Sequence, residues 1–211
     1  VLTIPPGDRL SKVVAPLLPG LGIENPVTGV LLAFRGYDTL LETFVLLGAL
    51  VAAWSLTPDA SRRLPPTTMV MTDPTSRIVA EAFTRLLAPA ALIIAAYLVW
   101  VGSDLPGGAF QAGAVLAGAL VVATLGGVVV LPRLDSLAAR IALMVGPLTF
   151  LAIGLAGAAL GGRFLAYPDG LEKTLIVTIE YALAISIAAG LALLAIGPPQ
   201  PMPNNARADA R

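Results

Sequence analysis

Four long stretches of this sequence contain almost no charged side chain, and they constrain the fold more than any other feature. Each has about 18 or more largely apolar residues, which is the length that a helix needs to cross a bilayer. They run over 86–103, 108–131, 141–162 and 174–196. A fifth apolar stretch, 26–56, carries charges in its middle. The pattern predicts an all-α fold, a polytopic transmembrane helical bundle of about five spans.

The composition agrees with a membrane protein and removes several kinds of site. Charged residues make up 12% of the 211 residues, against roughly 25% in soluble domains. Cysteine is absent, which excludes disulfides, thiolate metal sites and iron–sulfur clusters, and histidine is absent too. A net charge of zero gives no indication of a nucleic-acid partner. We expect no cofactor and no fixed metal site, so proton or cation chemistry must use the remaining polar groups.

Lys and Arg are distributed unevenly between the two sides of the predicted bundle. Four arginines lie in the connection 57–85, whereas the turn 104–107 has neither Lys nor Arg. Because basic loops stay in the cytoplasm, we expect 57–85 and the C-terminus to be cytoplasmic and the turn to face outward. The polar tail 198–211 is typical of a disordered segment. The chain starts at Val1 rather than Met, so the question whether a further helix precedes it stays open.

Three charged residues lie inside the fifth apolar stretch. Arg35, Asp38 and Glu42 have the spacing i, i+3 and i+7, so they share one face of a helix. A charge near mid-bilayer costs roughly 2.5–3.5 kcal/mol unless it pairs or faces a wet cavity. One interpretation is an ion or proton station, with Glu42 as the carrier and Arg35 as the tuning charge. The other is that the span begins near Thr39, with the first two charges at headgroup level. Gly36 would allow the helix to break.

Glu180 is a fourth ionisable residue within an apolar stretch. It lies about seven residues into 174–196, roughly 10 Å deep at 1.5 Å per residue. Two interpretations stand equal: a carboxylate of an ion path, or a structural hydrogen bond to a neighbouring protein chain.

Glycines and other small residues mark turns and close packing. Pro106-Gly107-Gly108 predicts a tight turn between two helices, because proline fixes one φ and glycine permits a positive one. Small residues at four-residue spacing predict close helix packing. They recur at Ala109, Gly113 and Ala117, and again at Gly154, Ala158 and Gly162.

The residues around this turn resemble a known signature. Val-Gly-Ser-Asp-Leu-Pro-Gly-Gly-Ala-Phe-Gln-Ala-Gly, 101–113, is similar to the Gly-His-Asn-x-Pro-Gly-Gly-Gly-Phe-x-Gly-Gly motif of the MnhB/MrpB component of Mrp-type cation/proton antiporters. Ser103, Asp104 and Ala109 stand where that family has His, Asn and a third Gly. The shared residues are Gly102, Pro106, Gly107, Gly108, Phe110 and Gly113.

A second resemblance covers residues 25–42. It is similar to a block at the C-terminal end of a large component of the same antiporters, and in the corresponding small component of membrane-bound hydrogenases. The matching residues are Phe34, Arg35, Gly36, Asp38, Thr39, Leu40 and Glu42. The chain therefore looks like a fusion, with a segment like the tail of that large component, a cytoplasmic linker, an MnhB-like four-helix domain and a disordered tail. The expected bounds are 1–57, 58–73, 74–197 and 198–211.

The resemblance implies a non-enzymatic component of a multi-subunit Na⁺/H⁺ antiporter in a bacterial inner membrane. Its implied partners are the large complex I-like subunits, the small subunits and the lipid bilayer, with Na⁺ and H⁺ as the ions. Glu42 and Asp38 are then the first candidates for the ion path and for transient Na⁺ contact, followed by Arg35 and Glu180. Two alternatives remain: the same module in a redox-driven ion-pumping complex, or a purely structural membrane component.

Overall fold

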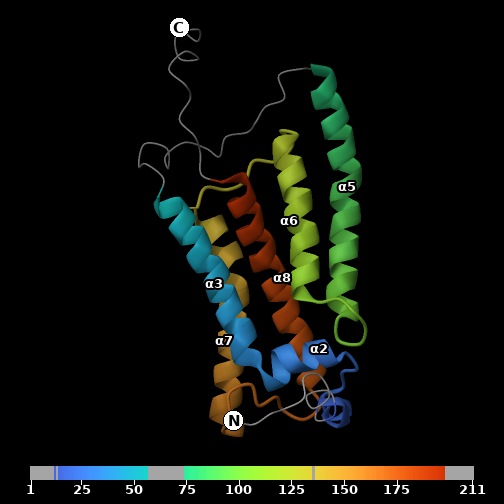
Figure 1. Ribbon diagram of the computed structural model, residues 1–211, viewed down its shortest axis with the longest axis vertical. Coiled ribbons are helices and arrows are strands. Elements are labelled where there is room, and N and C mark those ends of the chain that lie inside the picture. The colour runs from blue at the N-terminus through green and yellow to red at the C-terminus, as the bar shows by residue number, and fades with distance from the viewer. Residues whose placement is uncertain (1–11, 13, 57–73, 135, 198–211) are drawn as a thin grey trace, which may run out of the picture.

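The regular elements of the described residues are all helical, which confirms the predicted all-α fold. The computed structural model describes residue 12 and residues 14–56, 74–134 and 136–197. The predicted linker and tail lie outside these ranges. Five long helices form the bundle in Figure 1: α3 (Gly36–Ser55), α5 (Pro74–Val101), α6 (Ala109–Leu125), α7 (Leu137–Gly161) and α8 (Glu172–Ile196).

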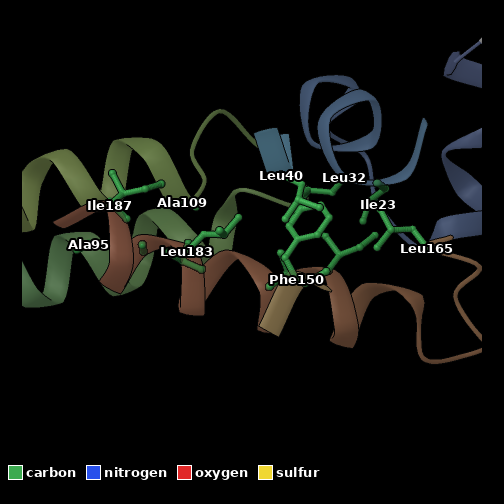
Figure 2. Close-up of a cluster of buried hydrophobic side chains, with 14 of the residues drawn as sticks. Ile23, Leu32, Leu40, Ala95, Ala109, Phe150, Leu165, Leu183 and Ile187 are labelled. Atoms are coloured by element: carbon green, nitrogen blue, oxygen red, sulfur yellow. The ribbon is translucent and has the colours of Figure 1, made fainter. Parts of the chain in front are cut away.

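Helix α8 lies at the centre of the bundle and contacts α3, α5, α6 and α7. The most apolar 18 residues of α8 are 61% buried, whereas those of α5 are 17% buried. A helix that is apolar on all sides is typical of such a central place. Figure 2 shows Leu183 and Ile187 of α8 in the same buried cluster as Ala109 of α6 and Phe150 of α7. The residues around Glu180 are therefore enclosed by other helices of the same chain.

Four of the described helices are long and apolar enough to span a membrane, so the chain is a multi-pass membrane protein. They are Gly36–Ser55, Glu81–Val101, Leu137–Gly161 and Glu172–Ile196. A bent pair adds a fifth candidate. It consists of the short helices η1 (Ala15–Leu17) and η2 (Pro19–Leu21), followed by α2 (Pro26–Gly29) and η3 (Val30–Phe34), with an 81° bend between the two halves.

The fifth apolar stretch, 26–56, is not one continuous helix, because it breaks at Arg35. Residues Val30–Phe34 form a π-helix, Arg35 leaves helical geometry with φ −128° and ψ 35°, and α3 starts at Gly36. Gly36 is buried, and a side chain there would collide with Leu165. The glycine that was expected to allow a break therefore stands directly after one.

The predicted apolar span 108–131 is helical over only 17 of its residues, Ala109–Leu125. Gly126 caps α6, and Gly127 has a φ of +71°, a conformation that ends a helix readily when the residue is glycine. The shortened α6 is about 26 Å long at roughly 1.5 Å per residue.

The two stripes of small residues behave differently. The α6 stripe is buried, and a Cβ on Gly113 would lie 2.7 Å from Ile187 Cγ2, so α6 and α8 approach closely as predicted. The α7 prediction is wrong as a helix contact. Gly154 packs against the ring of Phe164, and Gly162 is the left-handed C-cap beyond the helix, with φ +71°. Within this stripe, Gly154 therefore accommodates the loop after α7 instead of another helix.

A serine of α8 inserts into the backbone ladder of α7. Pro147 cannot donate a backbone hydrogen bond and disturbs the turn that precedes it. There the Gly146 N–H donates to Ser186 Oγ at 2.8 Å, and Ser186 Oγ donates to the carbonyl of Ala142 at 2.9 Å. Side-chain insertion of this kind is a recognised cause of helix bending. It also fixes the register of α7 against α8.

Candidate functional site

The turn between α5 and α6 is held first by the N-terminal segment. Asn25 caps α2 by accepting a hydrogen bond from Val27 N at 3.0 Å. Its Nδ2 donates to the carbonyls of Gly102 and Leu105 at 2.8 and 2.9 Å. Thr28 Oγ1 donates to the same Gly102 carbonyl at 2.6 Å. These buried side chains satisfy turn carbonyls that would otherwise lack partners, so α2 and the turn form one unit.

A salt bridge ties the same turn to the start of α8. Lys173 Nζ lies 2.7 and 2.9 Å from the two carboxylate oxygens of Asp104. The hydrogen bond from Lys173 lowers the pKa of Asp104, partial burial opposes that effect, and Ser103 Oγ donates a further bond at 3.0 Å. Asp104 therefore binds α8 in addition to its place in the turn.

Glu180 of α8 closes against the N-terminus of α6. Its carboxylate lies within reach of the backbone N–H of Ala109, the first residue of α6. Gly108, the residue before it, has a φ of +113°, and a Cβ there would lie 2.8 Å from Glu180 Oε1. The carboxylate thus takes the place that a side chain at residue 108 would fill. A helix N-terminus favours a negative charge at this point.

One oxygen of this carboxylate has no hydrogen-bond partner. Glu180 is 5% exposed, and its Oε2 is fully buried and makes no hydrogen bond within the described residues. Burying a carboxylate oxygen without a hydrogen-bond partner is costly while the group is charged.

The remaining motif residues make the turn tight enough for this arrangement. A Cβ on Gly107 would lie 2.5 Å from the carbonyl of Leu98, and one on Gly102 would lie 2.6 Å from the backbone nitrogen of Gly108. Gly108 N donates to the Leu98 carbonyl at 2.9 Å. Pro106 directly precedes these glycines, and Phe110 is 43% exposed on the outside of α6. The glycines of the predicted turn therefore also leave room for the carboxylate of Glu180.

Arg35, directly before α3, and Asp38 and Glu42 on α3 are all exposed. Arg35 and Asp38 form a salt bridge of 2.5 Å, with side chains 62% and 48% exposed. Glu42 is exposed as well. The structure therefore separates the four predicted site residues into an outer group on α3 and a single buried carboxylate on α8.

Sequence reasoning missed the residues that satisfy the broken helix. Thr39 Oγ1 donates to the Leu31 carbonyl at 2.7 Å, and the hydroxyl of Tyr167 donates to the Leu32 carbonyl at 2.8 Å. Burial raises the pKa of Tyr167, which keeps this hydroxyl a donor. No local pattern points to Tyr167, because it lies 135 residues from its partner. Asn25 stands directly before Pro26, which is a sequence signal for a helix cap but gives no sign of the bonds to the turn.

Among the residues that the structure describes, no three acidic side chains gather closely enough to hold a metal ion.

A comparison with protein families places the second half of the chain. The family described as "Domain related to MnhB subunit of Na+/H+ antiporter" matches residues 79–198, more than half of the 211 residues. The chain belongs to this MnhB-related family. The family is one of transporter components rather than enzymes. A comparison with curated proteins found no match for this MnhB-related chain.

Among solved structures, the MnhB-related chain matches one described as "Structure of Mrp complex from Dietzia sp. DQ12-45-1b". The TM-score is 0.67 at 22% sequence identity, and the match covers 92% of this chain. It spans only 23% of the length of that chain. At this identity the likeness shows a shared fold. Because it covers 92% of the residues, it extends well beyond the 79–198 region into the N-terminal segment.

Proposed function

We propose that this MnhB-related chain is a membrane component of a multi-subunit monovalent cation/proton antiporter. The observation that carries the proposal is the family match over residues 79–198, whose description names a Na⁺/H⁺ antiporter. The fold likeness to a chain of an Mrp complex supports it. Its partners are then the other Mrp-type subunits, and the exchanged ions are Na⁺ and H⁺.

The N-terminal residues 1–57 act in this proposal as a segment like the tail of the large Mrp component, fused to an MnhB-like domain over 74–197. One solved chain matches 92% of this chain, so both parts have counterparts within a single polypeptide. The hydrogen bonds from Asn25 and Thr28 to Gly102 join the two parts into one structure. Such a buried polar junction is typical of a permanent contact between the parts.

The ion path uses Glu42 and Asp38 on α3, Arg35 as their neighbour, and Glu180 as a separate buried carboxylate. Charges on the lipid-facing surface of a span cost roughly 2.5–3.5 kcal/mol each near mid-bilayer. Because the α3 charges are exposed on this chain, they need a cover of protein or a wet cavity between subunits. The α3 face is therefore both a partner contact and a place where an ion can meet Glu42.

The orientation follows from the ends of the helices. In Figure 1 the start of α5 and the ends of α3 and α8 lie at one end of the bundle, and the α5–α6 turn lies at the other. By sequence, the segments that adjoin the first end, 57–85, 132–140 and 198–211, contain eight Lys or Arg residues, against five on the other side: Arg9, Lys12, Arg35, Arg163 and Lys173. The excess of basic residues favours a cytoplasmic place for this end, and so for the C-terminus, in a bacterial inner membrane.

The test is Na⁺-dependent proton exchange in everted vesicles that contain the whole complex. Wild type is compared with Glu42→Gln at equal amounts of assembled complex. We expect exchange to fall to background, because glutamine cannot carry a charge or a proton. Asp169→Asn is the matched control, since it neutralises an exposed carboxylate in the loop before α8 and should leave exchange unchanged.

Three other outcomes would contradict parts of the proposal. Normal exchange in Glu42→Gln means that the α3 face is structural. Loss of assembled complex in the same variant indicates a purely structural role for the chain. Exchange that is absent in the wild-type complex overturns the antiporter assignment itself.

A further inference from the structure

Among the described residues, three buried side-chain polar atoms have no hydrogen-bond partner: Trp54 Nε1, Thr84 Oγ1 and Glu180 Oε2, of which only the last belongs to an ionisable group. One carboxylate oxygen lies against Gly108 at the N-terminus of α6, and the other is buried without a partner in the described part of the chain. The residue is 5% exposed, and Gly108 leaves out the side chain that would displace it. The N-terminus of α6, the space left by the missing side chain of Gly108 and an unpartnered buried oxygen thus lie together.

The surroundings favour a proton over a metal cation at this oxygen. The group that faces Glu180 from α6 is a backbone N–H at a helix N-terminus, whose partial positive charge opposes a metal cation, while the burial of Oε2 without a partner disfavours the charged carboxylate. An alkali cation needs several oxygen ligands, and the other polar side chain near Gly108 is Gln111, whose Oε1 lies 3.7 Å from the Cβ position. A proton neutralises the carboxylate without further ligands.

The charged groups on the elements around α8 do not neutralise Glu180. Helix α6 carries no charged residue, and Arg140 of α7 and Glu81 and Arg85 of α5 lie toward the opposite end of the bundle. Lys173, two turns earlier on α8, is bound to Asp104. On α3 the charges of Arg35, Asp38 and Glu42 point outward.

We propose that Glu180 is a proton-binding latch between α8 and the turn 102–108. When ionised, its carboxylate holds the N-terminus of α6, and when protonated it loosens that hold. Asn25 and Thr28 are hydrogen-bonded to the same turn, so a shift of the turn also moves the N-terminal segment. The proposal rests on the proposed function and deepens it, because it names the proton as the ligand of this carboxylate.

The first test is infrared difference spectroscopy on the whole complex in lipid vesicles, titrated over pH. We expect a carboxylic-acid C=O band that grows at low pH in wild type, disappears in Glu180→Gln, and persists in the Asp169→Asn control. In Glu180→Asp the band should remain and shift, which covers the case in which Glu180→Gln fails to assemble. Identical spectra in wild type and both Glu180 variants overturn the proposal. A titration midpoint that moves with Na⁺ concentration also overturns it, since the site would then bind the cation.

The second test measures the latch itself. Hydrogen–deuterium exchange of residues 102–113, corrected for its intrinsic pH dependence, should speed up severalfold as Glu180 takes up its proton. In Glu180→Gln it should be fast at every pH. Exchange that is equally slow in wild type and variant contradicts the latch. Neither readout needs transport, so a complex that titrates as expected but exchanges no ions disproves the proposed function alone.

Discussion

Glu42 and Glu180 lie within apolar spans of this chain, and their environments differ. Glu180 is buried at the centre of the bundle, where the N-terminus of α6 and the cradle of Gly108 receive it. Glu42 is exposed on the outside of α3, beside a salt bridge between Arg35 and Asp38. The fold of the single chain thus accommodates Glu180, whereas Glu42 depends on whatever covers α3 in the membrane. The environment of Glu180 is therefore set by this chain alone, and that of Glu42 by the assembled complex.

Among the substitutions considered, Gly108→Val should disturb the buried site of Glu180 most severely. The new side chain would meet Glu180 Oε1 at 2.8 Å, and valine is strained at a φ of +113°. We expect a loss of roughly 3 kcal/mol or more, from a backbone strain of about 1–3 kcal/mol plus the displaced carboxylate. The measurement is the amount and the thermal unfolding of the assembled complex. Gly118→Ala in the same helix has open space around it and should change little; an equal loss there would remove the special role of Gly108.

Arg35→Met tests whether another subunit covers the exposed charges at α3, because it leaves Asp38 without its partner. The pair is worth about 0.2–1 kcal/mol while it is exposed, but about 2–5 kcal/mol if another protein of the complex buries it. We therefore expect weaker retention of the other subunits during purification and little change in the fold of this chain. Quantitative mass spectrometry of the purified complex measures the subunit ratio. Arg163→Met, in the exposed loop after α7, is the control. Unchanged ratios in Arg35→Met would place the α3 face against lipid headgroups instead.

The smallest effect is expected for Lys173→Met, at the edge of the Glu180 cradle. The Lys173–Asp104 pair is 46% and 36% exposed, so its contribution is at most about 1 kcal/mol. Because the pKa of Asp104 is lowered in the folded state, this contribution is complete above its ordinary value of 3.8 and disappears as the pH falls below it. Thermal unfolding at pH 7 and at acidic pH should show a small difference between wild type and variant that vanishes in acid. A difference that grows in acid would contradict the assigned pair.

Sequence reasoning reached the local features of both regions. The Pro106-Gly107-Gly108 turn, the cap at Asn25 and the break beside Gly36 each depend on residues within a few positions of one another. The π-helix before that break and the early end of α6 at Gly126 were not predicted. Apolar residues continue through both points, so hydropathy shows no boundary there.

The sequence by itself determined that this chain is an all-α membrane protein with a tight turn before α6 and ionisable residues in two of its spans. Hydropathy and turn chemistry are local quantities, so they can be read along the chain. Only the tertiary structure decided that the turn receives Glu180, which lies 72 residues from Gly108, and that Glu42 points outward. Helix α8 is apolar on every side, so its sequence does not mark which face meets α6. Packing of the small residues on α6 against α8 selects that face, and with it the partner of the buried carboxylate.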